Sequence, residues 1–423
     1  MSPGVNGGLG AIEALNPILH ALVKLIPPAT GASDIGRLSG WTFAIKDNTD
    51  IQGASKSDGL GPPHPRVATR DAEAVRRLRA AGATILAAAN LEELSFGATT
   101  QNPAWGACRN PWDPTRIPGG SSGGSAVAVA AGMVRAALGT DTGGSLRNPA
   151  SFCGVSALRP SHGLVPTLGV TPLSPSMDVV GPIARSVEEL AAVMEALAGG
   201  TVRAPELVDL ADLVVGVPST YFFDDLEPAV GSGFDAFLSL LTACRARVVP
   251  LGGLGDVAAV HLAMATLQNS EAIRHLQPYW NDPRVSDGVR GRLEAGRAVT
   301  TAEIEHSAAI AAQWRVAVDD ALDQVDVLAV PATPFVAPVA AADDLTQLSR
   351  RINRLTGCWS LTGTPVLAIP TAPAPAGLPV GVQLIGARGA DRRLLSVGES
   401  IQRESDWHLR RPDVHGQGSR AAT

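Results

Sequence analysis

The chain has 423 residues, of which 45% are hydrophobic and 17% charged, and its formal net charge is −6. This composition is typical of a globular protein with enough apolar surface for a core. The acidic balance and the lack of any block of Lys or Arg argue against a nucleic-acid partner, and no apolar run is long enough to predict a membrane span.

The four cysteines are far apart in the sequence and fit neither a CxxC metal pattern nor a dense disulfide framework. They are Cys108, Cys153, Cys244 and Cys358. We therefore expect free thiols and a cytoplasmic location. The N-terminus lacks a basic stretch followed by an apolar core, so it does not resemble a secretory signal. None of the eight histidines stands in a metal-ligand spacing such as HExxH, and we expect neither a metal nor a cofactor.

Hydrophobic periodicity predicts alternating helices and strands in the first half of the chain. In chain order these are a helix over 11–25 ended by Pro27-Pro28, a strand over 41–45, a helix over 71–81, a strand over 83–88, a helix over 125–134, a strand over 136–140 and a helix beginning near Pro149. Residues 101–124 are rich in Asn-Pro, Asp-Pro and Gly, which predicts a long loop. The alternation favours a sheet covered by helices.

The second half of the chain continues the same pattern. The predicted elements are a helix over 186–199, strands over 213–217 and 246–251, a mostly helical region over 255–325 with a loop near 281–287, and strands over 326–331, 366–370 and 380–385. From Arg410 the chain is polar, and we expect this tail to be frayed.

Lysine is rare in this chain, which has three lysines against 31 arginines. Lys46 follows the apolar run Phe43-Ala44-Ile45, so its ammonium is expected to be partly buried. Burial lowers a lysine pKa, and the neutral amine can then act as a base, whereas an arginine stays protonated. The alternative is a strand-end lysine that pairs with Asp47.

Two glycine-rich loops carry serines 24 positions apart, Gly119-Gly120-Ser121-Ser122-Gly123-Gly124 and Gly143-Gly144-Ser145. Glycines beside a serine allow successive backbone N–H groups to point at one spot, as an oxyanion hole requires. Two ordinary turns or a phosphate cradle are the alternatives. Neither loop has the GK[ST] ending of a P-loop, and no strand leads into Gly119, as a dinucleotide fingerprint would demand.

The run Gly120-Ser121-Ser122-Gly123-Gly124 also fits the G-x-S-x-G elbow of α/β-hydrolases, which must directly follow a strand. Residues 113–118 precede it and contain two prolines, so they cannot form a central strand. His162 is the only histidine near the glycine loops in sequence, and a solvated or structural role suits it better. A Ser–His–Asp triad therefore lacks an obvious base, and lysine remains the candidate.

Three stretches of the sequence carry a resemblance to a known family. They are Ile45-Lys46-Asp47-Asn48, the run from Asn110-Pro111-Trp112-Asp113-Pro114 through Pro118-Gly119-Gly120-Ser121-Ser122-Gly123-Gly124-Ser125, and Gly139-Thr140-Asp141-Thr142-Gly143-Gly144-Ser145-Leu146-Arg147-Asn148-Pro149-Ala150. With these stretches and the separation of its two serines, the chain resembles the amidase signature family. Weaker similarity continues through 178–185 and 326–334 and ends around 377–386, so the resemblance spans most of the chain.

The resemblance implies a Ser–cisSer–Lys triad. Ser145 would be the nucleophile, Ser121 the bridging serine preceded by a cis peptide bond, and Lys46 the base that is neutral at rest. The resemblance also implies an oxyanion hole built from the backbone N–H groups of Thr142, Gly143, Gly144 and Ser145. Supporting roles would fall to Asp141, Arg147 and Ser122. Cys153 is expected to be a packed thiol rather than a second nucleophile.

The family fold implied by the resemblance is a single large α/β domain over residues 1–410. Its mixed central sheet has about eleven strands and is covered by helices on both sides. The catalytic core would lie over about 40–200, the variable substrate-pocket region over about 200–325, and a polar tail over 411–423. The resemblance also suggests a homodimer, although the N-terminal helical segment that often makes dimer contacts in the family is shortened here.

The implied activity is hydrolysis of a carboxamide C–N bond of a small molecule, without nucleic acid or membrane as a partner. One alternative is the glutaminase component, the A subunit, of a tRNA-dependent amidotransferase, which releases ammonia from glutamine. Its typical motif after a Glu-Ala pair is not visible, since Glu271-Ala272 is followed by Ile273-Arg274-His275-Leu276-Gln277-Pro278. The other alternative is a non-catalytic amidase-like binding protein.

Overall fold

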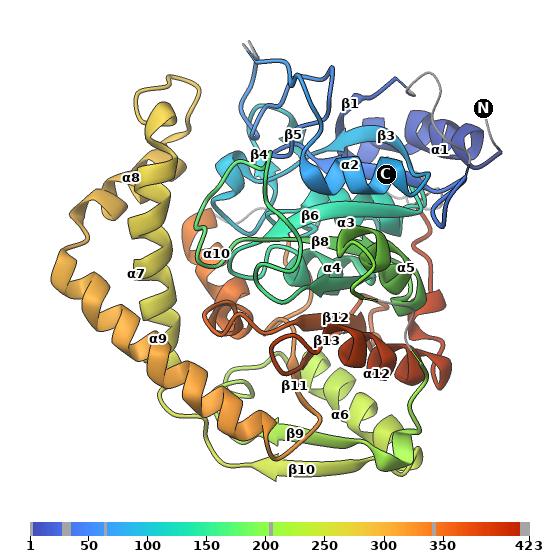
Figure 1. The fold of residues 1–423 in the computed structure, drawn as a ribbon, viewed down its shortest axis with the longest axis vertical. Coiled ribbons are helices and arrows are strands. Elements are labelled where there is room, and N and C mark those ends of the chain that lie inside the picture. Colours follow the sequence, from blue (N-terminus) through green and yellow to red (C-terminus); the bar gives the residue numbers. More distant parts are fainter. Residues whose placement is uncertain (1–2, 28–34, 63–65, 203–205, 341–343, 415–423) are drawn as a thin grey trace.

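A mixed sheet of eleven strands runs through the molecule (Figure 1). The structure is a computed structural model and describes residues 3–27, 35–62, 66–202, 206–340 and 344–414. From one edge of the sheet to the other, the strands are β1 Leu22–Leu25, β3 Thr84–Ala89, β2 Thr42–Lys46, β6 Ala136–Asp141, β8 Val179–Ala184, β7 Ser156–Arg159, β12 Val366–Pro370, β13 Gly381–Ile385, β11 Val327–Pro331, β9 Val214–Pro218 and β10 Arg247–Leu251. The expected sheet of about eleven strands is thus confirmed.

The sheet combines two parallel groups with an antiparallel centre. Strands β3, β2 and β6 are parallel to one another, as are β10, β9 and β11, while the remaining neighbours pair antiparallel. A separate two-stranded ribbon joins β4 Gln101–Asn102 to β5 Gly106–Ala107. Lys46 and Asp141 therefore end neighbouring parallel strands. As a result, Lys46 and the glycine loop that follows Asp141 lie at the same edge of the sheet.

Helices cover both faces of the sheet. In chain order they are α1 Pro3–Leu19, α2 Glu73–Ala80, α3 Gly123–Ala130, α4 Arg147–Cys153, α5 Val187–Leu197, α6 Pro228–Ala243, α7 Val257–His275, α8 Asp287–Ala298, α9 Thr301–Leu322, α10 Leu345–Ile352, α11 Gly357–Ser360 and α12 Asp391–Arg403. Apolar side chains of α2, α5, α6 and α12 pack on one face, and those of α1, α3 and α4 pack on the other.

Alternation along β2 assigns its side chains to these two faces. Phe43 and Ile45 belong to the core under α2 and α5, whereas Ala44 belongs to the core under α1 and α3. Because side chains of a strand point alternately to opposite faces, Lys46 follows Ala44 toward the α3 side. Ser121 lies just before α3, so the fold itself directs the amine toward this serine.

Helices α7, α8 and α9 stand together at one side of the molecule (Figure 1). A third core cluster lies where α7 and α9 meet the sheet, and Trp359 packs there against Phe222 and Trp314 with ring centroids 5.1 and 5.5 Å away. The aromatic residues of the variable region therefore serve mainly as packing.

The predicted helix over 11–25 is wrong at both ends, since α1 begins at Pro3. Helix α1 ends at Leu19, and His20 adopts a positive φ of 48°. Residues Leu22–Leu25 instead form β1, which pairs antiparallel with β3 at the edge of the sheet. Four apolar-rich residues that continue a helical period cannot be separated from the helix by periodicity alone. Pro28 and residues 415–423 of the predicted tail lie outside the described residues.

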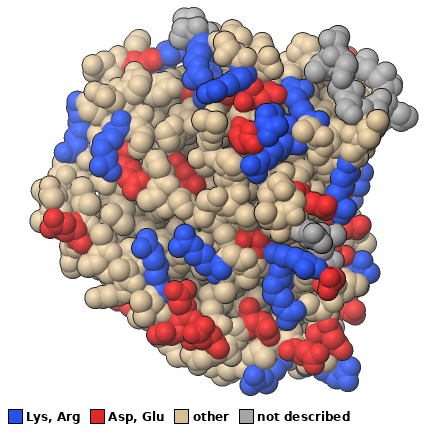
Figure 2. Space-filling view, in the orientation of Figure 1, with Lys and Arg blue, Asp and Glu red and all other residues tan. Residues whose placement is uncertain are grey.

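None of the helices in the described ranges is long and apolar enough to cross a membrane. Figure 2 shows the side chains of Lys and Arg interspersed with those of Asp and Glu over the face in view. No basic field covers this face, as would be needed to follow a phosphate backbone.

Close packing of α3 against the sheet depends on Gly124, and we expect Gly124→Ala to destabilise the protein. A Cβ at this position would lie 2.3 Å from the carbonyl oxygen of Ala21 and 2.5 Å from backbone atoms of Asn90. The free energy of unfolding, measured by urea denaturation, should fall by roughly 1–3 kcal/mol or more.

Gly10→Ala is the matched control, because nothing lies within 4 Å of a Cβ there and Gly10 is an exposed helical residue of α1. This variant should gain up to about 1 kcal/mol from helix propensity. Equal unfolding midpoints for the two variants would contradict the packing argument.

Candidate active site

Lys46 ends β2 and is completely buried. Its amine lies 2.7 Å from the hydroxyl oxygen of Ser121 and 2.8 Å from that of Thr140. The amide of Asn48 donates to the same Thr140 hydroxyl at 3.2 Å. The amine is thus surrounded by neutral hydroxyl groups rather than by a carboxylate.

Burial lowers the pKa of Lys46 from 10.5 to about 7, although the more distant charges of Asp141, Asp178 and Glu92 favour the ammonium form. Lys46 makes no ion pair with any residue that the structure describes. The alternative of a pair with Asp47 is wrong, because the carboxylate of Asp47 instead lies 3.5 Å from Lys24 and accepts the N–H of Ser57.

Ser121 follows a cis peptide bond to Gly120. Its carbonyl oxygen accepts the N–H of Glu92 at 3.1 Å, and the carboxylate of Glu92 accepts the N–H of Thr99 at 2.8 Å. The hydroxyl of Thr100 donates to the carbonyl of Gly119 at 2.8 Å. The turn after Glu92 thereby fixes the backbone on both sides of the serine that contacts Lys46.

Ser145 stands at the end of the glycine loop that follows β6, with 9% of its surface exposed. Ser122 connects the two serine loops, because its N–H donates to the carbonyl of Ser145 at 3.2 Å and its hydroxyl donates to the carbonyl of Thr140 at 3.1 Å. Within the described part of the chain, the hydroxyl of Ser145 makes no hydrogen bond. The structure therefore brings Lys46 to Ser121 by a direct contact and joins the two loops through Ser122.

The backbone amides of loop 141–145 differ in their partners. The N–H of Gly144 donates to the carboxylate of Asp141 at 2.9 Å. The amides of Thr142, Gly143 and Ser145 donate to no acceptor among the described residues. The family resemblance implied that Gly144 is one of the oxyanion donors, but its N–H is bound to Asp141, and the amides without an acceptor are those of its neighbours.

Asp141 lies at the centre of a buried ion cluster. Arg147 donates to its carboxylate through Nε at 3.0 Å and through one terminal nitrogen at 2.9 Å, and Arg159 donates at 3.2 Å. All three side chains have no exposed surface. Arg147 also donates to Gln383 and to the carbonyl of Thr356. The cluster thus connects the glycine loop to strands β7 and β13.

Opposed effects set the pKa of Asp141. Burial alone would raise it, but the charges of Arg147 and Arg159 outweigh burial and hold it below its usual range. Burial lowers the pKa of Arg159 to about 10. Asp141 therefore remains ionised, and its two oxygens can continue to hold the amides of Gly144 and Leu146.

Sequence reasoning missed several residues of this site. Thr140 and Asn48 lie in the stretches that carry the family resemblance. Thr140 directly precedes Asp141, and Asn48 follows Lys46 by two positions, so their closeness in sequence was the available signal. Glu92 gave no signal beyond following a predicted strand. Arg159 lies 18 residues from Asp141 in sequence, and only the pairing of β7 with β8 brings it back.

Two other residues singled out in the sequence lie in structural roles. Cys153 is fully buried, burial raises its pKa well above the ordinary value, and its thiol donates to the carbonyl of Pro118 at 3.5 Å. The ring of His162 donates to the carbonyl of Pro175 at 2.8 Å. Among the described residues no group of His, Cys, Asp and Glu could hold a metal ion.

Two different cavities lie near the glycine loop. Thr142 and Thr140 line a cavity of about 60 Å³, whose other lining residues include the apolar Val170 and Leu173 and the polar Asn48 and Asp178. A cavity of about 120 Å³ lies on the side of Gly143, since its lining residue Met264 would be 3.3 Å from a Cβ at that glycine.

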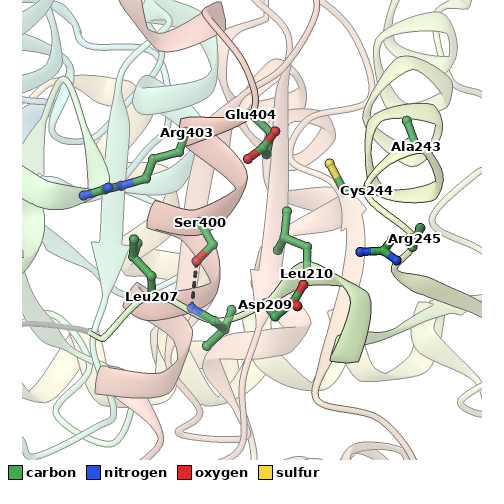
Figure 3. A pocket seen from close by; sticks show the side chains of 10 residues that line it. Leu207, Asp209, Leu210, Ala243, Cys244, Arg245, Ser400, Arg403 and Glu404 are labelled. Carbon is green, nitrogen blue, oxygen red and sulfur yellow. Dashed lines mark hydrogen bonds between the residues drawn. The ribbon is translucent and has the colours of Figure 1, made fainter.

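A larger hollow of about 380 Å³ lies elsewhere, between the end of α6 and helix α12 (Figure 3). It also contains a serine and a cysteine, but Ser400 accepts the N–H of Val208 at 2.9 Å and burial raises the pKa of Cys244. Neither side chain hydrogen-bonds to a basic group among the described residues, so the two do not form a nucleophile with an adjacent base.

The chain is similar to known amidases and to amidotransferase A subunits. A family model described as Amidase matches residues 23–395. The A subunit of the glutamyl-tRNA(Gln) amidotransferase from Roseiflexus sp. strain RS-1 is 34% identical, over 90% of this chain and 86% of its own length. A crystal structure described as an amidase superposes with a TM-score of 0.85 at 35% identity, covering 95% of both chains. The crystal structure of the corresponding amidotransferase chain from Thermotoga maritima gives a TM-score of 0.82 at 30% identity, covering 95% of this chain and 91% of that one.

We expect Asp141→Asn to destabilise the fold strongly. The substitution removes the charge that compensates Arg147 and Arg159, which would leave two buried cations without a counter-ion. The free energy of unfolding at pH 7 should fall by roughly 3–5 kcal/mol. Guanidinium denaturation monitored by circular dichroism measures this change.

Glu73→Gln removes a carboxylate from a surface pair with Arg76 and serves as the control, with an expected loss below about 1 kcal/mol. If both variants unfolded at the denaturant concentration of the wild type, the buried cluster would have no stabilising role.

Proposed function

This chain belongs to the amidase family, and on that premise we propose that it hydrolyses a carboxamide C–N bond of a small molecule through an acyl-enzyme on Ser145. The observation that carries the proposal is the buried amine of Lys46, 2.7 Å from Ser121 and without a counter-ion among the described residues. An amine in this setting is a base that functions near neutral pH. The family and the amidase structure among its neighbours support an enzyme that cleaves C–N bonds.

The proton path begins at Lys46. With a pKa of about 7, a large share of its amine is neutral at physiological pH and can accept the proton of Ser121. Ser121 in turn takes the proton of Ser145, whose hydroxyl makes no hydrogen bond to any described residue. Catalytic hydrogen bonds often shorten only when substrate binds, so we assign the contact between the two serines to the substrate complex.

Attack of Ser145 on the carbonyl carbon forms the C–O bond and places negative charge on the carbonyl oxygen. The uncommitted amides of Thr142, Gly143 and Ser145 are the donors we assign to this oxyanion. Collapse breaks the C–N bond, and the relay reverses to protonate the leaving amine. A water molecule then adds to the ester and gives its proton to the relay. Collapse breaks the C–O bond to Ser145, the relay returns a proton to the serine oxygen, and the free acid leaves.

Similarity to the A subunits of amidotransferases supports a second candidate. In that role the same three side chains would release ammonia from glutamine for use by a protein complex. The two functions differ in what the isolated chain does, since a small-molecule amidase needs no other protein. Ammonia release from glutamine that appears only after further proteins of such a complex are added would favour the amidotransferase role.

Covalent labelling tests the assigned nucleophile. A fluorophosphonate probe should form a stable adduct on Ser145 of the wild type, which peptide mass spectrometry locates, and Ser145→Ala should give none. Lys46→Ala and Ser121→Ala should label at least 100-fold more slowly, because loss of a general base typically costs two to four orders of magnitude.

Ser400→Ala is the matched control, since this serine lies in the hollow of Figure 3 and accepts a backbone N–H. Its labelling rate should equal that of the wild type. Full amide hydrolysis by Ser145→Ala would refute the assignment, and complete inertness of the wild type toward probe and amides would favour a non-catalytic protein.

Activity should rise with pH through about 7. Below the pKa of Lys46 the amine is charged, so kcat/KM should fall about tenfold for each pH unit, and above it the value should level off. A pH profile of kcat/KM with a hydrolysed amide measures this dependence. A flat profile between pH 5.5 and 8.5 would contradict Lys46 as the base.

Lys46→Met is the companion variant. It should be inactive yet at least as stable as the wild type at pH 7, because lowering the pKa from 10.5 to about 7 disfavours the folded state by roughly 5 kcal/mol. The folded pKa lies below the unfolded one, so this cost disappears as the pH rises from about 7 to 10.5. The wild type should therefore gain stability relative to Lys46→Met over that interval, as measured by urea denaturation.

A further inference from the structure

The segment between α7 and α8, residues 276–286, packs against two loops near the candidate active site. The side chains of Leu276 and Val285 share one apolar cluster with those of Leu60 and Leu94. Leu60 belongs to the loop that follows β2, and Leu94 belongs to the turn that follows β3. Because α7, α8 and α9 stand together at one side of the molecule, we call residues 276–286 the arm tip (Figure 1).

Polar contacts also join the arm tip to these two loops. The hydroxyl of Tyr279 donates to the carboxylate of Asp58 at 2.7 Å. The N–H of Ser286 donates to the carboxylate of Glu93 at 2.7 Å. Tyr279 and Asp58 meet through their side chains, so a substitution can remove this contact without altering the backbone.

The side chain of Asp58 depends on Tyr279 for its hydrogen bond. Asp58 has 3% of its surface exposed, and its φ of 53° lies in the left-handed region, where a residue other than glycine is held only by its surroundings. Its Oδ1 atom is buried and has no hydrogen-bond partner in the described ranges. Loss of the tyrosine hydroxyl would therefore leave a buried carboxylate without a donor, which favours an outward movement of Asp58 toward water.

The backbone of Asp58 connects the two partners of the contact between Lys46 and Ser121. Its N–H donates to the carbonyl of Asp47, the residue after Lys46, at 3.0 Å. Its carbonyl accepts the N–H of Leu94 at 2.8 Å, and Leu94 belongs to the turn that holds the carbonyl of Ser121. A displacement of Asp58 would thus act on both sides of the 2.7 Å contact between the Lys46 amine and the Ser121 hydroxyl.

We propose that Asp58 and Tyr279 are positioning residues for the amine of Lys46, and that the arm tip keeps this amine buried and in contact with Ser121 by holding Asp58 in place. The two residues act through the backbone of the loop and the turn, since Tyr279 donates to Asp58 and not to the triad. This inference rests on the proposed function, because Lys46 is the base of that reaction. Release of the arm tip would let water reach the amine, and water stabilises the ammonium form.

Tyr279→Phe releases the arm tip without changing a charge. The acids whose charges act on Lys46 are Asp141, Asp178 and Glu92. A phenylalanine keeps a ring against the apolar cluster and removes the donor to Asp58. Since burial is the largest cause of the lowered pKa of Lys46, this pKa should rise in the variant through exposure to water alone.

Carbon-13 NMR of the lysine side chains measures the effect without any substrate. The chain has three lysines, so labelling at Cε gives three signals, and Lys46→Met identifies the signal of Lys46. Its titration midpoint should move from about 7 in the wild type to about 8 or higher in Tyr279→Phe. Asp58→Ala should shift it in the same direction. Asp58→Asn keeps an oxygen that can accept the Tyr279 hydroxyl, so its midpoint should stay near that of the wild type.

Tyr221→Phe is the matched control, because Tyr221 is the other tyrosine of the chain and packs edge-on against Phe222 in a different core cluster. It should leave the midpoint of Lys46 unchanged. A general loss of stability does not alter a midpoint measured within the native state, so the shift distinguishes positioning from a merely structural role. An unchanged midpoint in Tyr279→Phe, or equal shifts in both tyrosine variants, would overturn the assignment.

The pH profile of amide hydrolysis connects the position of the amine to turnover. In Tyr279→Phe the inflection of kcat/KM should move upward together with the NMR midpoint, so kcat/KM at pH 6 should fall about tenfold, with KM within about twofold of the wild type. A shifted midpoint with an unshifted profile would count against Lys46 as the base, and so would an inert wild type count against the proposed function. In both cases the NMR midpoint still decides whether the arm tip positions the amine.

Discussion

The site depends on the burial of one amine beside hydroxyl groups. Water would hold Lys46 in its charged form, and a carboxylate within contact distance would do the same, so the fold must exclude both. It does so by ending β2 inside the protein and by keeping Asp141 and Asp178 at a distance where they moderate the pKa without pairing. The carboxylate of Asp141 pairs with Arg147 and Arg159 instead. The charge of Asp141 is thus compensated by the two arginines, while Lys46 has no contacting counter-ion and a pKa of about 7.

Much of the architecture could be predicted from the sequence because its signals are local. The strand that ends in Lys46 is an apolar run that stops abruptly, and the glycine loops are evident from their composition. The mostly helical character of residues 255–325 was also predicted, and α7 and α9 lie in this region. The family resemblance then implied the roles of Lys46, Ser121 and Ser145 in proton transfer and attack.

What the sequence could not supply depends on contacts between distant segments. Strand β8 contains Gly181 and Pro182, which weaken a strand pattern, yet a Cβ at Gly181 would lie only 2.1 Å from the carbonyl of Leu158. The inward direction of the Gly144 amide follows from the position of the Asp141 carboxylate, which no local pattern encodes. The cavity lined by Met264 and Gln268 likewise combines α7, α8 and α10, and its lining could not be predicted before these helices are packed together.

The buried ion cluster has a consequence for how such an enzyme diversifies. Arg147 hydrogen-bonds to Gln383 on β13 and to the carbonyl of Thr356 before α11, and so connects the glycine loop to both. Helices α7 and α8 contribute walls to the cavity beside Gly143 but none of these tethers. Substitutions in α7 and α8 can therefore change the shape of this cavity without breaking the hydrogen bonds that hold the glycine loop. Descendants of one ancestor can in this way come to consume different compounds while preserving a single reaction.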